Sequence, residues 1–134
     1  MVNRIDAFVV EHMSYLWDGG FQLVRSEVTD HNGGDGALVV EGGDLRIRIV
    51  QDRSQLLLDL QRRADGGDEW FPIDLVRRLY TGERERSAVL DDGYAALLGE
   101  VLPDLQRRFA ADRWPQTRER LKILKRLRST EMFG

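Results

Sequence analysis

The first candidates for chemistry are oxygen-bearing side chains at the spacing of a calcium-binding loop. Asp30, Asn32 and Glu41 stand at the first, third and twelfth positions of the EF-hand pattern. The fifth position is Gly34, which offers no side-chain ligand, and the sixth, where the pattern needs glycine, is Asp35. The sequence therefore predicts a solvated loop without a metal, and no other segment indicates a cofactor.

The residues of nucleophilic and nucleotide chemistry do not form a recognisable pattern either. The two histidines, His12 and His31, lack a metal-ligand spacing, and His12 falls on an apolar helical stripe. No serine lies in a Gly-x-Ser-x-Gly elbow, and no glycine run continues into Gly-Lys-Ser/Thr. The chain has no cysteine, which excludes thiolate catalysis. We therefore predict that it is not an enzyme.

An acidic segment followed by tryptophan is the leading candidate for binding. Asp65, Asp68 and Glu69 surround a Gly-Gly doublet, and Trp70 follows directly. With Asp74 these acids have the residue types of a glycosidase, but acidic loops are usually only solvated. Tryptophan is enriched at interface hot spots. The aromatic pair Trp70-Phe71 is therefore interpreted either as a plug at one end of the core or as an anchor for a partner protein.

The C-terminal segment concentrates positive charge beside three leucines, Leu121, Leu124 and Leu127. The cations are Arg118, Arg120, Lys122, Lys125, Arg126 and Arg128. Three interpretations remain open. The leucines can dock on the core, with the cations toward the negative end of the helix. The cations can bind nucleic-acid phosphates, or they can pair with the acidic body of the same or another chain.

Glycine doublets, each with a nearby aspartate, divide the first half into the elements that must position these residues. The apolar spacing predicts a helix that Asn3 caps and that ends near Gly19. Strands are predicted at 21–28, 37–41, 45–49 and 56–60. They predict one α+β domain over 1–134, with an N-terminal helix, a four-stranded antiparallel meander and three C-terminal helices packed on one sheet face.

Proline, glycine and aspartate mark those three helices. The first follows Pro72 and closes at Gly82, as proline prefers the first turn and glycine the end of a helix. Asp91 is the predicted cap of the second, which Pro103 should kink or divide. The third starts at Pro115.

The predicted hairpin turns determine which residues share a sheet face. Turns centred on 42–43 and 52–53 pair Val40 with Leu45, and send the aliphatic residues of all three strands to one side. Those residues are Leu38, Val40, Leu45, Ile47, Ile49, Leu56 and Leu58. A slip of one residue would turn every one of them outward.

The opposite face of the predicted sheet is charged. Arg46 is placed opposite Asp59, and Glu41 lies diagonally from Arg46. We expect solvent or a partner protein to contact this charged face.

The charge is unevenly distributed along the chain. The net charge is −3, yet residues 112–134 hold 7 basic and 3 acidic side chains, against 13 and 20 in the preceding part. Overall acidity does not favour nucleic-acid binding. No apolar run approaches the roughly 20 residues of a membrane span, and the N-terminus is charged at once. A cytoplasmic location without membrane contact is expected.

A succession of short segments resembles a known kind of protein. Leu45-Arg46-Ile47-Arg48-Ile49 leads to Asp52-Arg53, then to Leu58-Asp59-Leu60 and finally to Trp70-Phe71. This order resembles small uncharacterised bacterial α+β proteins and immunity proteins of bacterial toxin systems, over residues 20–134. The resemblance implies a small α+β fold that binds a partner protein, and it supplies no catalytic residues.

Three functional hypotheses follow. The leading one is a non-enzymatic, immunity- or inhibitor-type module that neutralises a basic partner protein, such as a toxin or nuclease-like protein. Its candidate contacts are Asp65, Asp68, Glu69, Trp70, Arg46 and Asp59. The second is a nucleic-acid-associated regulator that uses the six C-terminal cations. The third is a homodimer or larger homo-oligomer with a structural role.

Overall fold

The structure, a computed structural model, describes residues 4–28, 36–64 and 69–133. The described elements are α1 (Arg4–His12), α2 (Tyr15–Asp18), β1 (Gln22–Val28), β2 (Gly36–Gly42), β3 (Leu45–Asp52), β4 (Gln55–Arg62), β5 (Phe71–Pro72), α3 (Ile73–Thr81), α4 (Asp92–Arg108) and α5 (Trp114–Phe133). Asn3, which we expected to cap the first helix, lies outside the described residues.

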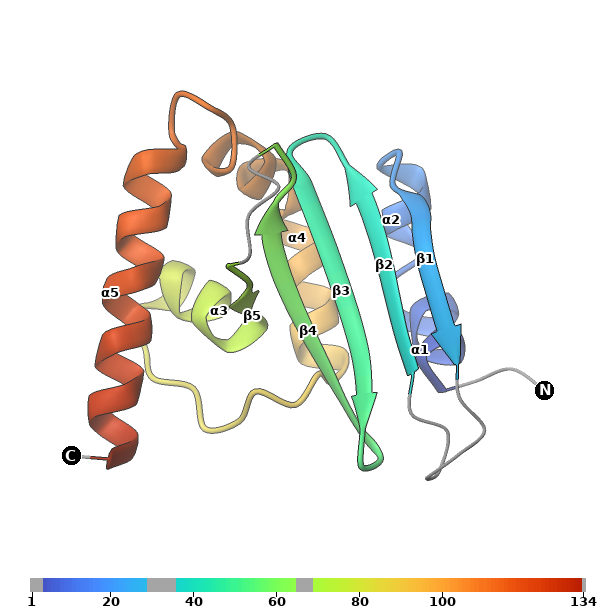
Figure 1. Ribbon diagram of the computed structural model, residues 1–134, viewed down its shortest axis with the longest axis horizontal. Coiled ribbons are helices and arrows are strands. Elements are labelled where there is room, and N and C mark those ends of the chain that lie inside the picture. Colours follow the sequence, from blue (N-terminus) through green and yellow to red (C-terminus); the bar gives the residue numbers. More distant parts are fainter. Residues whose placement is uncertain (1–3, 29–35, 65–68, 134) are drawn as a thin grey trace.

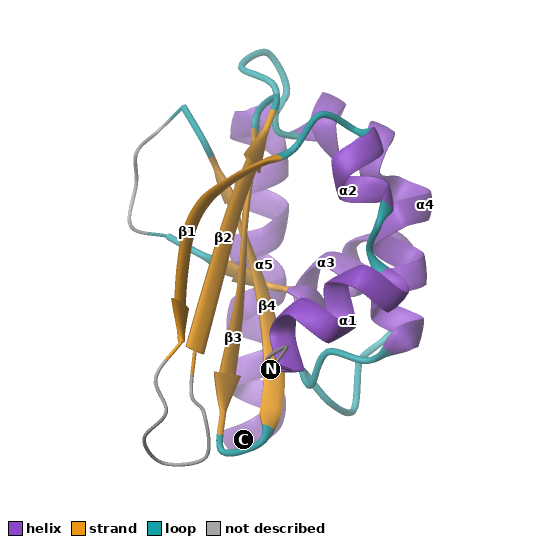
Figure 2. Cartoon of the chain, turned by 90° about the vertical axis from the view of Figure 1, so that its right-hand side faces the viewer, coloured by secondary structure: helices purple, strands orange, loops and turns teal. Residues whose placement is uncertain are grey.

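One antiparallel sheet and its helices confirm the α+β prediction. The strands follow the order β1-β2-β3-β4-β5, so each pairs with its neighbour in the chain. Helices α1 to α4 cover one face of the sheet, and the other face has no described layer on it (Figures 1 and 2). The finer arrangement differs from the prediction, because β5 adds a fifth strand and α5 stands beside α3 at the β5 edge instead of on the sheet face (Figure 1).

Both central hairpins pair two residues away from the predicted register. Val40 lies opposite Ile47 rather than Leu45, and Ile49 lies opposite Leu58 rather than Leu56. The strands extend further toward their turns, which are centred on 43–44 and 53–54. Because side chains alternate with a period of two, a shift of two residues preserves the faces. The predicted aliphatic set is accordingly buried.

The N-terminal helix is interrupted where one continuous helix was expected. Leu16 N donates to Met13 O at 3.1 Å, and Trp17 N donates to Ser14 O at 3.1 Å. This three-residue spacing is tighter than that of an α-helix. The change of winding separates α1 from α2. Of the predicted apolar stripe, Ile5, Val9, Met13 and Leu16 are buried, while Phe8 and His12 are half-buried at its edge.

The later helices begin and end close to the predicted signals. Gly82 has φ 76°, a left-handed conformation that favours glycine, and it ends α3. The Asp91 carboxylate accepts from Tyr94 N at 2.9 Å and caps α4. Pro103 does not divide α4, which runs unbroken through it, with the proline on the exposed side. Pro115 is the second residue of α5.

Three aromatic residues join the sheet edge to the last two helices. The ring centroid of Trp114, at the start of α5, lies 4.8 Å from that of Phe109 and 6.1 Å from that of Phe71 in β5. Phe71 and Phe109 are fully buried. Edge-on and tilted aromatic contacts of this kind add about 1 kcal/mol each to the stabilisation from burial. They place α5 along the β5 edge, where Leu121 and Leu124 are also buried.

Candidate protein interface on the open sheet face

The open face carries a row of hydrogen-bonded charges across its three central strands. Glu41, Arg46 and Gln61 are cross-strand neighbours on β2, β3 and β4. Arg46 donates from Nε to the Glu41 carboxylate at 2.6 Å and from Nη1 to Gln61 Oε1 at 2.7 Å. Arg63 adds a second cation 3.2 Å from Glu41. The strand register thus places the outward-facing polar residue Arg46 of β3 between polar residues of β2 and β4.

A second row holds the tryptophan. Arg48 donates from Nη2 to Asp59 Oδ2 at 3.0 Å, and its guanidinium carbon lies 4.2 Å from the centroid of the Trp70 ring. A cation over an indole face attracts the ring through its quadrupole. Trp70 directly precedes β5, whose Pro72 pairs with Asp59 across the strands. The strand pairing and the Arg48 contact therefore both position Trp70 at the open face.

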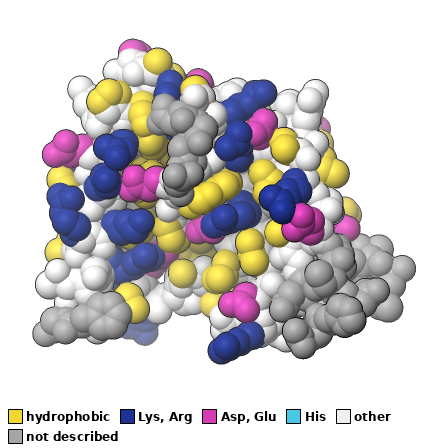
Figure 3. All heavy atoms as spheres, viewed as in Figure 1, with side chains coloured by type: hydrophobic (Ala, Val, Ile, Leu, Met, Phe, Trp, Pro, Cys, Tyr) yellow, Lys and Arg dark blue, Asp and Glu magenta, His cyan; other side chains and the backbone are white. Residues whose placement is uncertain are grey.

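Apolar side chains lie among these charges. Val39, Val50, Leu57 and Pro72 fall on the same side of the sheet as Arg48 by strand register, and all four are half-buried. Figure 3 shows hydrophobic side chains gathered between basic and acidic ones near the middle of this face. Such a mixture, an apolar centre with charged surroundings, is typical of a protein-binding surface.

Glu69 links this face to α5. Its carboxylate lies 3.6 Å from Arg118 Nη2 and 3.6 Å from Lys122 Nζ. The two cations are four residues apart on one helix, so they are neighbours on the same side of it. Glu69 is therefore already neutralised within the chain.

The residues predicted to bind a partner divide into three groups. Arg46 and Asp59 lie on the open face, Trp70 stacks beside them, and Glu69 points to α5. Asp65 and Asp68 lie outside the described residues. The predicted pairing of Arg46 with Asp59 is wrong, because the two-residue register shift places Arg48 opposite Asp59.

Sequence reasoning missed Arg48 as a site residue. It sits two positions after Arg46 on an alternating strand, so it had to share the face that Arg46 occupies. Of the Trp70-Phe71 pair, Phe71 is the fully buried core plug and Trp70 remains half-buried outside it. The two interpretations of the aromatic pair thus apply to different residues.

Half of the cations of the basic helix are paired with acids of the same chain. Besides Arg118 and Lys122, Arg128 donates from Nη1 to both oxygens of Asp74, at 3.0 and 2.9 Å. The remaining three cations, Arg120, Lys125 and Arg126, are exposed, and no acid of the described residues forms an ion pair with them. Half of the predicted phosphate-binding set is therefore engaged in holding α5 to the body.

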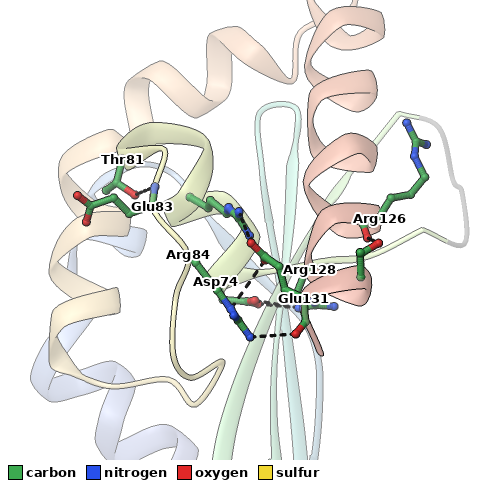
Figure 4. A network of polar contacts seen from close by, with 9 residues as sticks. Asp74, Thr81, Glu83, Arg84, Arg126, Arg128 and Glu131 are labelled. Atoms are coloured by element: carbon green, nitrogen blue, oxygen red, sulfur yellow. Dashed lines mark hydrogen bonds and ion pairs between the residues drawn. The ribbon is translucent and has the colours of Figure 1, made fainter. Parts of the chain in front are cut away.

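A second ion pair closes the same junction. Arg78 of α3, itself buried, donates from Nη1 and Nη2 to the Glu131 carboxylate at 2.8 and 3.0 Å. This contact lowers the pKa of Glu131 and raises the pKa of Arg78. Figure 4 shows Asp74 meeting Arg128 from α5, with Glu131 beside them. An adjacent cleft of about 690 Å³ is lined by Asp74, Arg84, Glu85, Arg86, Ser87, Ala88, Arg128 and Met132.

The paired acids have the properties of structural groups. Tyr80 and Arg108 donate to Asp104 at 2.6 and 2.7 Å, which lowers the pKa of that carboxyl group as Arg78 lowers that of Glu131. A general acid or base near neutral pH needs a carboxyl pKa shifted upward. These acids therefore act as ionised acceptors that join helices.

The described residues show neither a metal-binding cluster nor a membrane-spanning helix. His12 contacts Phe8 with the two rings tilted and their centroids 4.7 Å apart, and it is half-buried at the edge of the core. Asp30, His31 and Asn32 lie outside the described residues. The carboxylate of Glu41, the last position of the calcium pattern, forms ion pairs with Arg46 and Arg63.

Comparison of the chain with protein-family models, with curated proteins and with solved structures finds no match.

Proposed function

We propose that the chain is a non-enzymatic protein-binding module and that the open sheet face is its binding surface. The observation that carries the proposal is the stack of Arg48 on Trp70, in which the same guanidinium also donates a hydrogen bond to Asp59. An aromatic side chain held in place before binding loses little conformational freedom in the complex. Arg46, Asp59, Glu69 and Trp70 are the proposed contacts, joined by Asp65 and Asp68, which come shortly before Glu69 in the sequence.

The proposed partner is a basic protein that the chain neutralises in the manner of an immunity or inhibitor protein. Glu41, Asp59 and Glu69 each have a cationic neighbour in the free chain. Basic groups of a partner must therefore compete with arginine or lysine for these acids. Charge would then determine specificity and the rate of association, and Trp70 with the apolar residues around it would supply most of the affinity.

The alternative of a nucleic-acid-associated regulator is the weaker proposal. Three of its six cations are paired with Glu69 and Asp74. Binding to phosphate would leave those two acids without their partners, one of them buried.

A capture experiment with matched variants tests the leading proposal. Tagged wild-type chain, Trp70→Ala and Ile123→Ala are incubated with extract of cells that express the chain, and bound proteins are quantified by mass spectrometry. Ile123 is an exposed apolar residue on α5 and belongs to none of the strands. We expect one partner to be retained by wild type and Ile123→Ala and to be lost with Trp70→Ala.

The purified partner then gives the affinity by calorimetry. A tryptophan hot spot is worth about 2 kcal/mol or more, so Trp70→Ala should weaken binding at least about 30-fold. Asp59→Lys should weaken binding of a basic partner further, and more strongly at low salt. Capture of the same proteins by all three baits, or equal affinities, would refute the proposal.

A further inference from the structure

β1 is the free edge of the sheet. At the opposite edge, β4 pairs with β5, and another residue of β4, Leu57, forms a bridge with Val89. β1 pairs only with β2, no described element lies beyond it (Figure 1), and its residues 22–27 are all exposed. An open edge strand presents unpaired N–H and C=O groups that can pair with another strand.

Exposed apolar residues gather in the elements at that end of the molecule. The described residues contain seven large hydrophobic side chains with high exposure, and four of them belong to the first three elements. They are Val10 of α1, Trp17 of α2, and Leu23 and Val24 of β1. Figures 1 and 2 show α1 and α2 packed behind β1 and β2. Leu23 and Val24 lie in the edge strand itself, where exposed apolar side chains favour contact with another protein.

The charges of β1 identify the partner. Arg25 and Glu27 flank Ser26 and lie on the open face, opposite Val39 and Ala37 of β2. Their side chains are 63% and 56% exposed, and they form an ion pair at 2.6 Å within the strand. A strand with a cation and an anion placed symmetrically about one residue is complementary to an antiparallel copy of itself.

We propose that the chain forms a homodimer in which β1 pairs antiparallel with β1 of a second copy, about a two-fold axis at Ser26. Arg25 then lies opposite Glu27 of the second copy, and Glu27 lies opposite Arg25 of that copy. The helices of both copies stay on one side of a continuous sheet. Cross-strand pairs of opposite charge stabilise such a seam, and the strand backbones add hydrogen bonds.

Neighbouring registers are less favourable for an electrostatic reason. A two-fold axis at Arg25 places the two arginines opposite each other, and an axis at Glu27 does the same with the two glutamates. Like charges directly opposite destabilise a strand pair. A bulge at Val24, where the register with β2 shifts, restricts regular pairing to the residues after it. The proposed interface is therefore short and the dimer dissociates on dilution.

Charge reversal and charge exchange test the register directly. Sedimentation velocity over a range of concentrations should show wild-type dimers. Glu27→Arg places arginines opposite each other at both ends of the seam and should raise the dissociation constant at least tenfold. The exchanged double variant Arg25→Glu/Glu27→Arg restores opposite charges and should dimerise like wild type. Glu119→Arg, an exposed charge reversal on α5, should have no effect.

A cross-link gives a second, independent readout. The chain has no cysteine, so Ser26→Cys introduces a single thiol at the proposed axis. Directly opposite residues of an antiparallel pair have Cα atoms about 4.5–5.5 Å apart, within disulfide range. Mild oxidation should give covalent dimers with Ser26→Cys and not with Thr130→Cys on α5.

Several outcomes would overturn the proposed dimer. They are a monomer at all concentrations, equal behaviour of the single and exchanged variants, and equal cross-linking at positions 26 and 130. Trp70→Ala leaves β1 unchanged, so it should dimerise normally. Loss of partner binding with intact dimers, or the reverse, therefore separates failure of this inference from failure of the proposed function.

Discussion

The junction of α3 and α5 allows a quantitative prediction. Asp74 is only 8% exposed, and Arg128 Nη1 contacts both of its oxygens at 2.9–3.0 Å. At an effective dielectric constant of about 20, unit charges about 3 Å apart attract by roughly 5 kcal/mol. Desolvation of the buried carboxylate offsets more than half of this attraction. Asp74→Asn should therefore lower the free energy of unfolding by about 2 kcal/mol.

Asp74 also lies in the first turn of α3, where a negative charge stabilises the helix by about 0.5 kcal/mol. To separate this contribution from the ion pair, Asp74→Asn is combined with Arg128→Gln. Residues in direct contact commonly show an interaction energy of about 1–2 kcal/mol in such a cycle. Arg126→Gln, an exposed cation on the same helix, should change stability by less than about 0.5 kcal/mol.

Urea unfolding followed by tryptophan fluorescence is the appropriate assay, since Trp114 lies at the start of α5 and is buried against Phe109. The interaction energy comes from the four midpoints if the slope of the transition is unchanged. Strictly additive effects of the two substitutions, or equal effects of Arg128→Gln and Arg126→Gln, would refute the docking of α5 through this ion pair.

Two further predictions concern pH and turn geometry. Burial raises the pKa of all three tyrosines, Tyr15, Tyr80 and Tyr94, above 10, so native protein should show no tyrosinate absorbance at pH 10. The stability from these neutral phenols is complete below pH 10 and is lost at higher pH. Arg53 and Ser54 have φ of 50° and 69° without glycine, so Arg53→Asn/Ser54→Gly should raise stability by about 1 kcal/mol in thermal unfolding, and Ser54→Val should lower it.

The face of each strand could be predicted from the sequence because alternation is a local property. Arg46 and Ile47 are on opposite sides whichever residue of β4 they meet. The register was missed by two residues because both real turns use unexpected positions. Residues 53–54 adopt the left-handed conformations of a tight hairpin without glycine. Local turn preferences therefore indicated the wrong central residues for both turns. The hydrogen-bonded pairing of the longer strands determined which register the hairpins adopt.

The candidate site was only partly visible from the sequence for the same reason. Arg46, Asp59 and Trp70 were identified by residue type, but the arginine that stacks on Trp70 is Arg48. That contact depends on β5 pairing with β4. A two-residue strand has too little pattern to be recognised from sequence, and the tertiary contacts of Phe71 hold it in place.

Composition and periodicity by themselves determined the α+β class, the buried aliphatic face and the charged opposite face, because each follows from contacts between residues near in sequence. Tertiary structure alone decided the role of the basic helix. Its cations meet Glu69 and Asp74 about 50 residues away, once the aromatic cluster around Trp114 places α5 at the sheet edge. Ion pairs between residues so far apart in sequence depend on how two elements pack together, and the local sequence does not predict that packing.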